Sequence, residues 1–247
     1  MMKQEHYPDM VEGRQPVLEC LRSGQAVNQL YVAQGSNQGS IRQIIQLARE
    51  QNIVVKEVPR SVLDSMSQTH NHQGVIAYIS PIQYIELDDL LALNKPPYYL
   101  VLAGIEDPHN LGSLIRSAEA CGFSGVIIPK RRATAVTPVV VKASAGAAAH
   151  LPIVRVTNLT AALKQLQDAG CWIVGADMDG QVCYEQDLRG PIALVIGSEG
   201  SGLPRLIKDN CDLLVRIPLY GAIESFNAAV AGGILMYEIQ RQNHTPK

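Results

Sequence analysis

Five nearly uninterrupted apolar runs in the second part of the chain constrain its fold more than any other feature. They read YYLVLAGI, GVIIP, CWIVGAD, IALVIG and LLVRIP, and helical segments alternate with them from Tyr98 onward. Runs without a polar side are typical of parallel strands that helices cover on both faces. The pattern therefore predicts an α/β domain with a doubly wound parallel sheet over residues 98–247.

A smaller α/β unit is predicted ahead of this domain. Helix-like and strand-like segments alternate along residues 1–80 in the order GRQPVLECLRSG, QLYVA, SIRQIIQLARE, NIVVKEV, PRSVLDSMS and GVIAYI. The next stretch is acidic and ends on the pair Pro96–Pro97, which breaks the alternation. We therefore expect a linker over 81–97, carrying one amphipathic turn, between the first domain (1–80) and the second (98–247).

Charge and composition exclude some classes of function and leave others open. The 247 residues carry 21 Lys and Arg against 23 Asp and Glu, a net charge of −2 without a basic tail. This balance neither indicates nor excludes a nucleic-acid partner. Aromatic residues make up only 5% of the chain, which disfavours a single-strand-binding barrel built on base stacking.

Cysteine use and the apolar pattern bear on the cellular compartment. Five cysteines without a C-x-x-C pair argue against a disulfide framework and against a zinc site, so we expect no metal and a reducing cytoplasm. The segment MMKQEHYPDM has no apolar signal region, and no run reaches the length of a membrane span. We therefore expect a soluble, unprocessed cytoplasmic protein with no membrane partner.

The first candidate site segment, GIEDPHNLGSLIRSAEACG, directly follows the strand-like YYLVLA. Pro108 suits the start of a helix, and Asn110 is expected at or near its N-cap. Open α/β sheets bind ligands in the loops after the carboxyl ends of their strands, which makes Asn110 and Arg116 candidate site residues. The alternative is an ordinary strand-to-helix junction.

The second segment, IALVIGSEGSGLPRLI, is a buried strand followed by a glycine-rich loop with Gly197 and Glu199. No G-K-[ST] follows, so the loop is not a phosphate-binding P-loop, and a nucleoside triphosphate is not indicated. The glycines allow backbone amides to approach a small ligand closely. A tight turn without a ligand is the alternative.

The third segment, LLVRIPLYGAIESFNAAVAGGILMYEIQRQ, is a strand, a loop and a long helix expected to begin near Ser225 as its N-cap. One side of this helix is small, which favours close packing on the sheet or against a second subunit. Three polar or glycine-rich loops after buried strands indicate a composite site. In an α/β domain such a site is typical of an enzyme that uses a nucleotide-like cofactor.

Together the three segments resemble the SpoU/TrmH class of SPOUT methyltransferases. The motif N-x-G-x-x-x-R stands at Asn110–Arg116, G-x-E-x-x-G-L at Gly197–Leu203, and I-P-x-x-G-x-x-x-S-x-N at Ile217–Asn227. The first domain is similar to the ribosomal-protein-like RNA-binding domain of the 23S rRNA guanosine-2′-O-methyltransferase branch. Phe226 departs from the usual leucine, and Ala228-Ala229 departs from the commoner valine followed by serine or alanine.

The resemblance implies a carboxy-terminal trefoil knot whose loops enclose a bent S-adenosylmethionine. Periodicity could not have predicted a knot, because knots are nearly absent from proteins. The implied cofactor residues are Gly197, Ile217, Leu219, Ser225 and Phe226. The resemblance also implies a homodimer in which Arg116 of one subunit reaches the pocket of the other.

The implied reaction moves a methyl group from a sulfonium to a ribose 2′-hydroxyl of RNA, most specifically of ribosomal RNA. The implied catalytic set is Asn110, Arg116, Glu199, Ser225 and Asn227. A hydroxyl is a poor nucleophile unless its proton leaves, so a proton acceptor or an alkoxide stabiliser is needed. The resemblance gives the base role to Arg116, but a guanidinium is normally always protonated, which favours a clamp on phosphate and oxyanion.

Other polar residues have weaker assignments. Glu199 is the better proton acceptor, or equally a structural carboxylate that orients its neighbours, while His109 is interpreted as a solvated loop residue. Lys130, Arg131 and Arg132 form a basic run that holds RNA phosphates or is a solvated loop.

In the first domain, His70 and His72 are predicted to lie in a polar, RNA-facing loop rather than in a metal site. Two other functions stay open: methylation of a transfer-RNA ribose, and a catalytically silent RNA-binding assembly factor.

Overall fold

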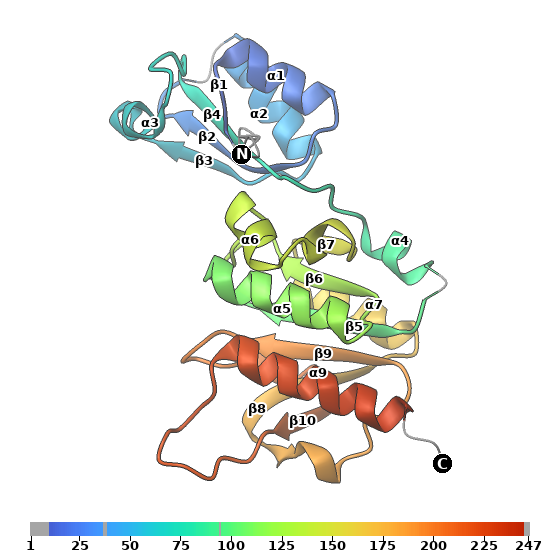
Figure 1. Cartoon of the computed structure of the whole chain (residues 1–247). Helices are drawn as coiled ribbons and strands as arrows, with labels where there is room; N and C mark the ends of the chain where they lie inside the picture. Colours follow the sequence, from blue (N-terminus) through green and yellow to red (C-terminus); the bar gives the residue numbers. More distant parts are fainter. Residues whose placement is uncertain (1–9, 37–38, 94, 245–247) are drawn as a thin grey trace, which may run out of the picture. The chain divides into compact units, whose positions relative to one another are not determined.

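The computed structural model describes residues 10–36, 39–93 and 95–244 of the chain (Figure 1). Contacts between residues divide it into two units, Met1–Gln83 with Val136–Pro138, and Tyr84–Ala135 with Val139–Lys247. They are called the N-terminal unit and the C-terminal unit below. Among the described residues, no helix combines the length and the apolar character of a membrane span.

The N-terminal unit is built on a mixed four-stranded sheet in the order β1-β4-β2-β3. β2 pairs with β3 in parallel, whereas β4 is antiparallel to both β1 and β2. Apolar side chains of α1 and α2 form one core with the sheet, and Leu63 of α3 belongs to a separate, smaller cluster. The bounds are β1 (Met10–Glu12), α1 (Arg14–Arg22), β2 (Val27–Ala33), α2 (Ser40–Glu50), β3 (Val55–Val58), α3 (Arg60–Met66) and β4 (Val75–Ile79).

The C-terminal unit holds a six-stranded sheet in the order β10-β8-β9-β5-β6-β7, with every neighbouring pair parallel. The predicted parallel-sheet α/β domain is therefore confirmed. The bounds are α4 (Leu87–Leu91), β5 (Tyr98–Ala103), α5 (Pro108–Ala120), β6 (Gly125–Pro129), α6 (Pro138–Ala143), η1 (Ala147–Ala149), β7 (Ile153–Val156), α7 (Leu159–Asp168), β8 (Trp172–Val182), η2 (Cys183–Glu185), β9 (Ile192–Gly197), α8 (Arg205–Lys208), β10 (Leu213–Arg216) and α9 (Ala228–His244).

Helices cover both faces of this sheet. Successive side chains along a strand point to opposite sides, so each strand packs against helices on both faces. Val195 belongs to a core cluster with side chains of α4, α7 and α8. Its neighbour Ile196 faces the other way, toward α9, where a Cβ on Gly232 would lie 3.6 Å from Ile196 Cγ1. Figure 1 shows α5 and α9 side by side on that face. The doubly covered sheet explains why its strands are apolar throughout.

Glycine in the first motif has a packing role in this unit. A Cβ on Gly112 would lie 2.5 Å from Ala143 Cβ and 2.9 Å from Val140 O. Only a glycine therefore lets α5 approach the α6 backbone this closely.

Part of the predicted 81–97 linker is packed into the C-terminal unit. The division between the units falls after Gln83. Ile85 N donates to Ile153 O at 3.1 Å, and Leu87 and Leu90 of α4 are buried in the core cluster. The amphipathic turn expected in this stretch is thus a helix that covers the sheet, because its two leucines need an apolar partner.

Candidate active site

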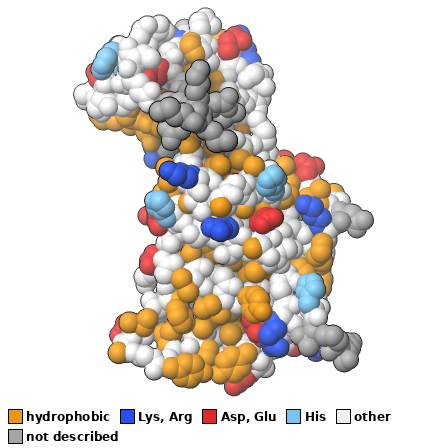
Figure 2. All heavy atoms as spheres, in the orientation of Figure 1, with side chains coloured by type: hydrophobic (Ala, Val, Ile, Leu, Met, Phe, Trp, Pro, Cys, Tyr) orange, Lys and Arg blue, Asp and Glu red, His pale blue; other side chains and the backbone are white. Residues whose placement is uncertain are grey.

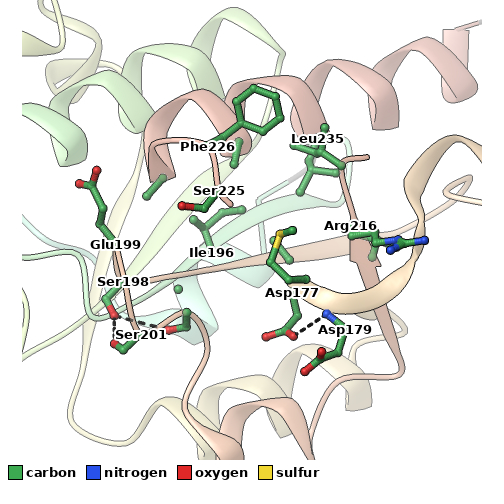
Figure 3. A pocket seen from close by; sticks show the side chains of 18 of the residues that line it. Asp177, Asp179, Ile196, Ser198, Glu199, Ser201, Arg216, Ser225, Phe226 and Leu235 are labelled. Atoms are coloured by element: carbon green, nitrogen blue, oxygen red, sulfur yellow. Dashed lines mark hydrogen bonds between the residues drawn. The ribbon is translucent and has the colours of Figure 1, made fainter. Parts of the chain in front are cut away.

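A cavity of about 310 Å³ opens beside the middle of β8 and the ends of β9 and β10, near the start of α9 (Figure 3). Part of its wall is apolar and includes Ile196, Val215 and Leu235. Another part carries the charged side chains of Asp177 and Lys208. Small-molecule sites commonly combine an apolar wall with a few placed polar groups. The cavity therefore suits a ligand that has both an apolar part and a charged part.

The loop after β9 folds back on itself and makes one wall of the cavity. Ser198 N donates to Gly202 O at 3.2 Å, and Gly202 N donates to Ser198 O at 3.0 Å. A Cβ on Gly197 would lie 2.3 Å from the Gly202 carbonyl carbon, so only glycine fits there. The close approach at Gly197 is thus to the chain itself. The loop is therefore a tight turn, as the sequence allowed, and this turn also lines the cavity.

Three polar side chains from separate segments form a hydrogen-bonded group, called here the amide–carboxylate cluster (Asn110, Glu199 and Asn227). Asn110 Nδ2 donates to Glu199 Oε2 at 3.0 Å, and Asn227 Nδ2 donates to Asn110 Oδ1 at 2.9 Å. Asn227 Nδ2 also lies 3.4 Å from Glu199 Oε1. Because a carboxylate accepts from both amides, the cluster fixes Glu199 at the wall of the cavity that it lines.

The starts of α5 and α9 place the two asparagines, and both starts differ from the expectation. Asp107, not Asn110, is the N-cap of α5, because its carboxylate accepts from His109 N at 3.1 Å and Asn110 N at 3.2 Å. Asn227, not Ser225, caps α9, since its Oδ1 accepts from the backbone N–H groups of residues 229 and 230. A short polar side chain reaches donors two and three residues ahead, which decides both caps.

The predicted cofactor residues lie mostly at this cavity. Gly197, Ile217, Ser225 and Phe226 line it. Figure 3 shows Ser225 and Phe226 on the loop before α9, above Ile196. Leu219 is absent from the cavity lining formed by the described residues.

Arg116 lies apart from the cavity and from the amide–carboxylate cluster. It is exposed on α5, six positions after Asn110. Within the described part of the chain its guanidinium has no hydrogen bond or ion pair, and it does not line the cavity. The structure therefore brings four of the five predicted catalytic residues to one place, Asn110, Glu199, Ser225 and Asn227, but not Arg116.

Both parts of the chain match known families. Residues 97–237 match the SpoU rRNA Methylase family, and residues 10–85 match the family described as RNA 2′-O ribose methyltransferase substrate binding. The chain is 44% identical over 248 residues to YacO of Bacillus subtilis strain 168, named as a TrmH family tRNA/rRNA methyltransferase, with 98% of each chain covered. The chain belongs to the SpoU methylase family.

Two solved structures are similar to this SpoU methylase over different lengths. The AdoMet-bound rRNA methyltransferase from Sinorhizobium meliloti has a TM-score of 0.56 and 27% identity, covering 94% of this chain and 86% of that chain. The A. aeolicus TrmH/SpoU tRNA modifying enzyme has a TM-score of 0.54 and 26% identity, covering 63% of this chain and 80% of that chain.

S-adenosylmethionine is the cofactor of this SpoU methylase. The chemistry of the cavity fits this cofactor, because its apolar wall suits an adenine. When bound, the cofactor supplies a methyl group on a positively charged sulfur. The residues of the chain supply the walls that orient it.

Sequence reasoning missed the charged wall of the SpoU methylase cavity. Asp177 and Asp179 lie within β8, just after the residues that pair with β9, and Lys208 comes from α8. Lys208 Nζ lies 2.6 Å from Asp177 Oδ2, and this hydrogen bond raises the pKa of Lys208. The signal for Asp177 was its place after the apolar run CWIVGA, at the strand edge that binds ligands. Lys208, on a four-residue helix, had no comparable signal.

The residues of the basic run, Lys130, Arg131 and Arg132, differ in their exposure to solvent. Lys130 is half-buried, and burial, followed by the nearby Arg155, lowers its pKa. Arg131 and Arg132 are exposed. Gly104 lies close to both the Arg132 carbonyl and Ser198. Because Ser198 lines the cavity, the loop that carries the basic run lies at the same edge of the sheet as the cavity.

The side chain of His72 is not exposed at the surface of the loop. Its side chain is buried, with Nε2 2.8 Å from Asp64 Oδ1, and Nδ1 accepts from Gly74 N at 3.0 Å. His70 is exposed and has a positive φ of 56°. The expectation of an RNA-facing pair is therefore wrong for His72, because its ring holds the turn together from inside.

Proposed function

We propose that this SpoU methylase transfers the methyl group of S-adenosylmethionine to a ribose 2′-hydroxyl of ribosomal RNA, and specifically to a guanosine of 23S rRNA. The observation that carries the proposal is the amide–carboxylate cluster, which joins all three motif segments by hydrogen bonds, together with the cavity that the second and third segments line. A catalytically silent assembly factor would not need this arrangement. The complete cluster thus favours an enzyme.

The N-terminal unit favours ribosomal RNA over transfer RNA. The rRNA methyltransferase from Sinorhizobium meliloti covers 94% of this chain, which includes that unit. The A. aeolicus tRNA modifying enzyme covers only 63% of it. Methylation of a transfer-RNA ribose stays the second candidate, because the family names allow both substrates.

The geometry favours a positioning role for Glu199. Its carboxylate accepts from Asn110 and lies within hydrogen-bond distance of Asn227, so its oxygens orient the two amides. We assign the chemistry of the 2′-hydroxyl to Arg116 instead, as a cation that holds the adjacent phosphate and stabilises the developing alkoxide. Ser225 stays a candidate polar contact to the substrate or cofactor, because it lines the cavity.

Because Arg116 lies apart from the cavity of its own chain, we propose that it serves the cavity of a second copy in a homodimer. Exposed apolar side chains support a second copy: Val230, Ile234 and Tyr237 on α9, near Tyr220. Ile234, Tyr237 and Tyr220, but not Val230, line a groove of about 500 Å³. Figure 2 shows hydrophobic side chains gathered over this part of the C-terminal unit. Exposed apolar patches of this kind mark interaction surfaces.

The small side of α9 has a separate explanation. A Cβ on Gly232 would lie 2.4 Å from Leu114 Cδ2 of the same chain, so close packing on α5 already requires a glycine there. The dimer is therefore supported by the exposed apolar side chains rather than by the small residues.

Mixed subunits test the shared site. Inactive Arg116→Ala subunits are exchanged with inactive Asn227→Ala subunits, and methyl transfer to rRNA is measured. Each mixed dimer is expected to regain up to one working site. If exchange restores nothing, or if the active protein sediments as a monomer, the shared site is refuted.

Three further proposals follow from the same placement. The exposed Arg131 and Arg132 hold RNA phosphates at the sheet edge of the cavity. The loops 198–202 and 217–227 both contribute to the cavity wall, which supports the implied trefoil knot. All five cysteines are free thiols, which supports a reducing compartment such as the cytoplasm.

The function is tested by mapping 2′-O-methyl positions in RNA from cells with and without this protein. The expected result is the loss of one methylated guanosine in 23S rRNA. Purified protein, given S-adenosylmethionine and that rRNA without its modification, should restore it. Loss of a mark on transfer RNA instead would favour the second candidate, and an unchanged map would contradict both.

A further inference from the structure

An ion pair stands in the wall of the cofactor cavity and is used by none of the roles assigned above. Lys208 Nζ lies 2.6 Å from Asp177 Oδ2 and 3.7 Å from Asp179 Oδ2. The side chain of Asp177 is only 6% exposed and that of Lys208 is 30% exposed. Removing charges from water is unfavourable unless they are well paired, so a nearly buried pair inside a cavity calls for an explanation beyond stability.

The pair lies away from the amide–carboxylate cluster. Figure 3 shows Asp177 and Asp179 on one side of the cavity and Ser198 and Glu199 on the other, with Ile196 between them. Glu199 is held by Asn110 and Asn227, as described above. The Asp177 side is therefore a second polar region within the same cavity.

This region offers a ligand both a positively charged donor and negatively charged acceptors. The Lys208 ammonium carries three N–H donors, and the two aspartates account for at most two of them. Asp177 Oδ1 accepts from Asp179 N at 3.1 Å, and each carboxylate oxygen has a second lone pair. Asp179 is 87% exposed and can turn toward a ligand. Donors and acceptors of opposite charge thus stand within a few ångströms of one another.

We propose that the Asp177–Lys208 pair recognises the zwitterionic amino-acid end of S-adenosylmethionine, with Lys208 binding the α-carboxylate and Asp177 with Asp179 binding the α-ammonium. The adenine is accounted for by the apolar wall of Ile196 and Leu235. A ribose would need acceptors for its hydroxyls but no cation. Only the amino-acid group matches both signs.

This inference rests on the cofactor of the proposed function but not on which RNA is methylated. Calorimetry compares S-adenosylhomocysteine, which has the amino-acid end, with 5′-methylthioadenosine, which lacks it. The full-length chain is measured as the unmodified protein, as Lys208→Gln and as Asp177→Asn. Both variants are expected to lower the affinity for S-adenosylhomocysteine at least about tenfold, as for a lost charged hydrogen bond. They should lower the affinity for 5′-methylthioadenosine less than about twofold.

The matched control is Arg205→Gln, which removes a cation from the same short helix. Arg205 pairs with Asp209 at 3.9 Å and does not belong to the described cavity wall, so both affinities should stay unchanged. Lys208→Arg keeps the charge and should retain most of the affinity for S-adenosylhomocysteine. Because Lys208 is partly exposed, its variants test the inference even if Asp177→Asn does not fold.

Two outcomes overturn the inference while the proposed function stands. If the variants lowered the affinity for both nucleosides equally, the pair would support the cavity wall or contact the ribose rather than bind the amino-acid end. Unchanged S-adenosylhomocysteine affinity in Lys208→Gln would remove the pair from recognition. If the unmodified chain bound neither nucleoside, the proposed methyl transfer would fail together with the inference, whereas failure of RNA methylation with intact binding would leave the inference standing.

Discussion

The two units of this SpoU methylase are both α/β layers, but they arrange the ends of their strands differently. All neighbouring strands of the C-terminal sheet are parallel, so every carboxyl end lies at one edge. In the N-terminal sheet β4 runs against β1 and β2, so the loops are divided between two edges. A parallel sheet gathers loops into a cavity, and a mixed sheet distributes them over a surface. From this difference we expect the chemistry in the C-terminal unit and, because residues 10–85 match a substrate-binding family, the selection of RNA in the N-terminal unit.

Separating the units should have the largest effect. A chain truncated to begin at Tyr84 keeps α4, the whole parallel sheet and the cavity. We expect its affinity for S-adenosylhomocysteine to stay within about twofold, because no cavity residue is removed. Methylation of rRNA should fall by on the order of 100-fold, since linked binding units increase affinity by that order. Calorimetry and a methyl-transfer assay measure the two quantities.

A second truncation, beginning at Pro96, sharpens this result. It removes Leu87 and Leu90 from the core of the C-terminal unit and should therefore be less stable than the chain that begins at Tyr84. Undiminished rRNA methylation by the longer truncated chain would contradict the division of labour between the units.

Leu90→Ala tests whether α4 belongs to the C-terminal unit. Leu90 is fully buried, so the substitution should lower the free energy of unfolding by about 2–5 kcal/mol through lost burial and a cavity. Leu93→Ala, at a 37% exposed leucine just after α4, should change it by less than about 0.5 kcal/mol. Urea unfolding measures both. Equal effects of the two substitutions would show that α4 is part of a loose linker.

Gly112→Ala tests the close packing beneath the first motif. The added Cβ would lie 2.9 Å from Val140 O and 3.0 Å from Ala143 C, and these backbone atoms cannot move aside as a flexible side chain can. We expect a loss of about 2 kcal/mol of unfolding free energy from overpacking. Ser113→Ala, at the next and exposed position of α5, is the control and should be nearly neutral. A stable Gly112→Ala protein would mean that α6 does not hold α5 in place.

The sequence predicts the fold best where local patterns agree with tertiary packing. The apolar runs predicted parallel strands, and the structure has them. It adds β7 (Ile153–Val156), whose four residues include the charged Arg155 and lack a continuous apolar run. It also adds β1 (Met10–Glu12), which is too short for a period-two pattern. These strands are defined by pairing with distant segments, and no local pattern reports such pairing.

The sequence predicted those residues of the candidate site that stand in the three motif segments. The amide–carboxylate cluster joins Asn110 to residues far along the chain, and its members were named from the motifs. The choice of Asn227 over Ser225 as the cap of α9 could not be made in advance, because both residue types are good caps. Lys208 was missed because its partner, Asp177, stands on another element and only the folded chain brings them together.

His72→Ala should have the smallest effect and separates an internal support from a surface in the N-terminal unit. The His72 ring loses two hydrogen bonds, to Asp64 and from Gly74 N, so unfolding free energy should fall by about 1 kcal/mol. The loss is limited because the Asp64 side chain is 60% exposed and water can replace the ring there. His70→Ala is the matched change at an exposed histidine of the same turn and should leave stability unchanged. If the turn is part of the RNA-binding surface of this unit, His70→Ala should weaken rRNA binding in a filter assay while stability stays unchanged. Weaker RNA binding in His72→Ala without any loss of stability would contradict the internal role.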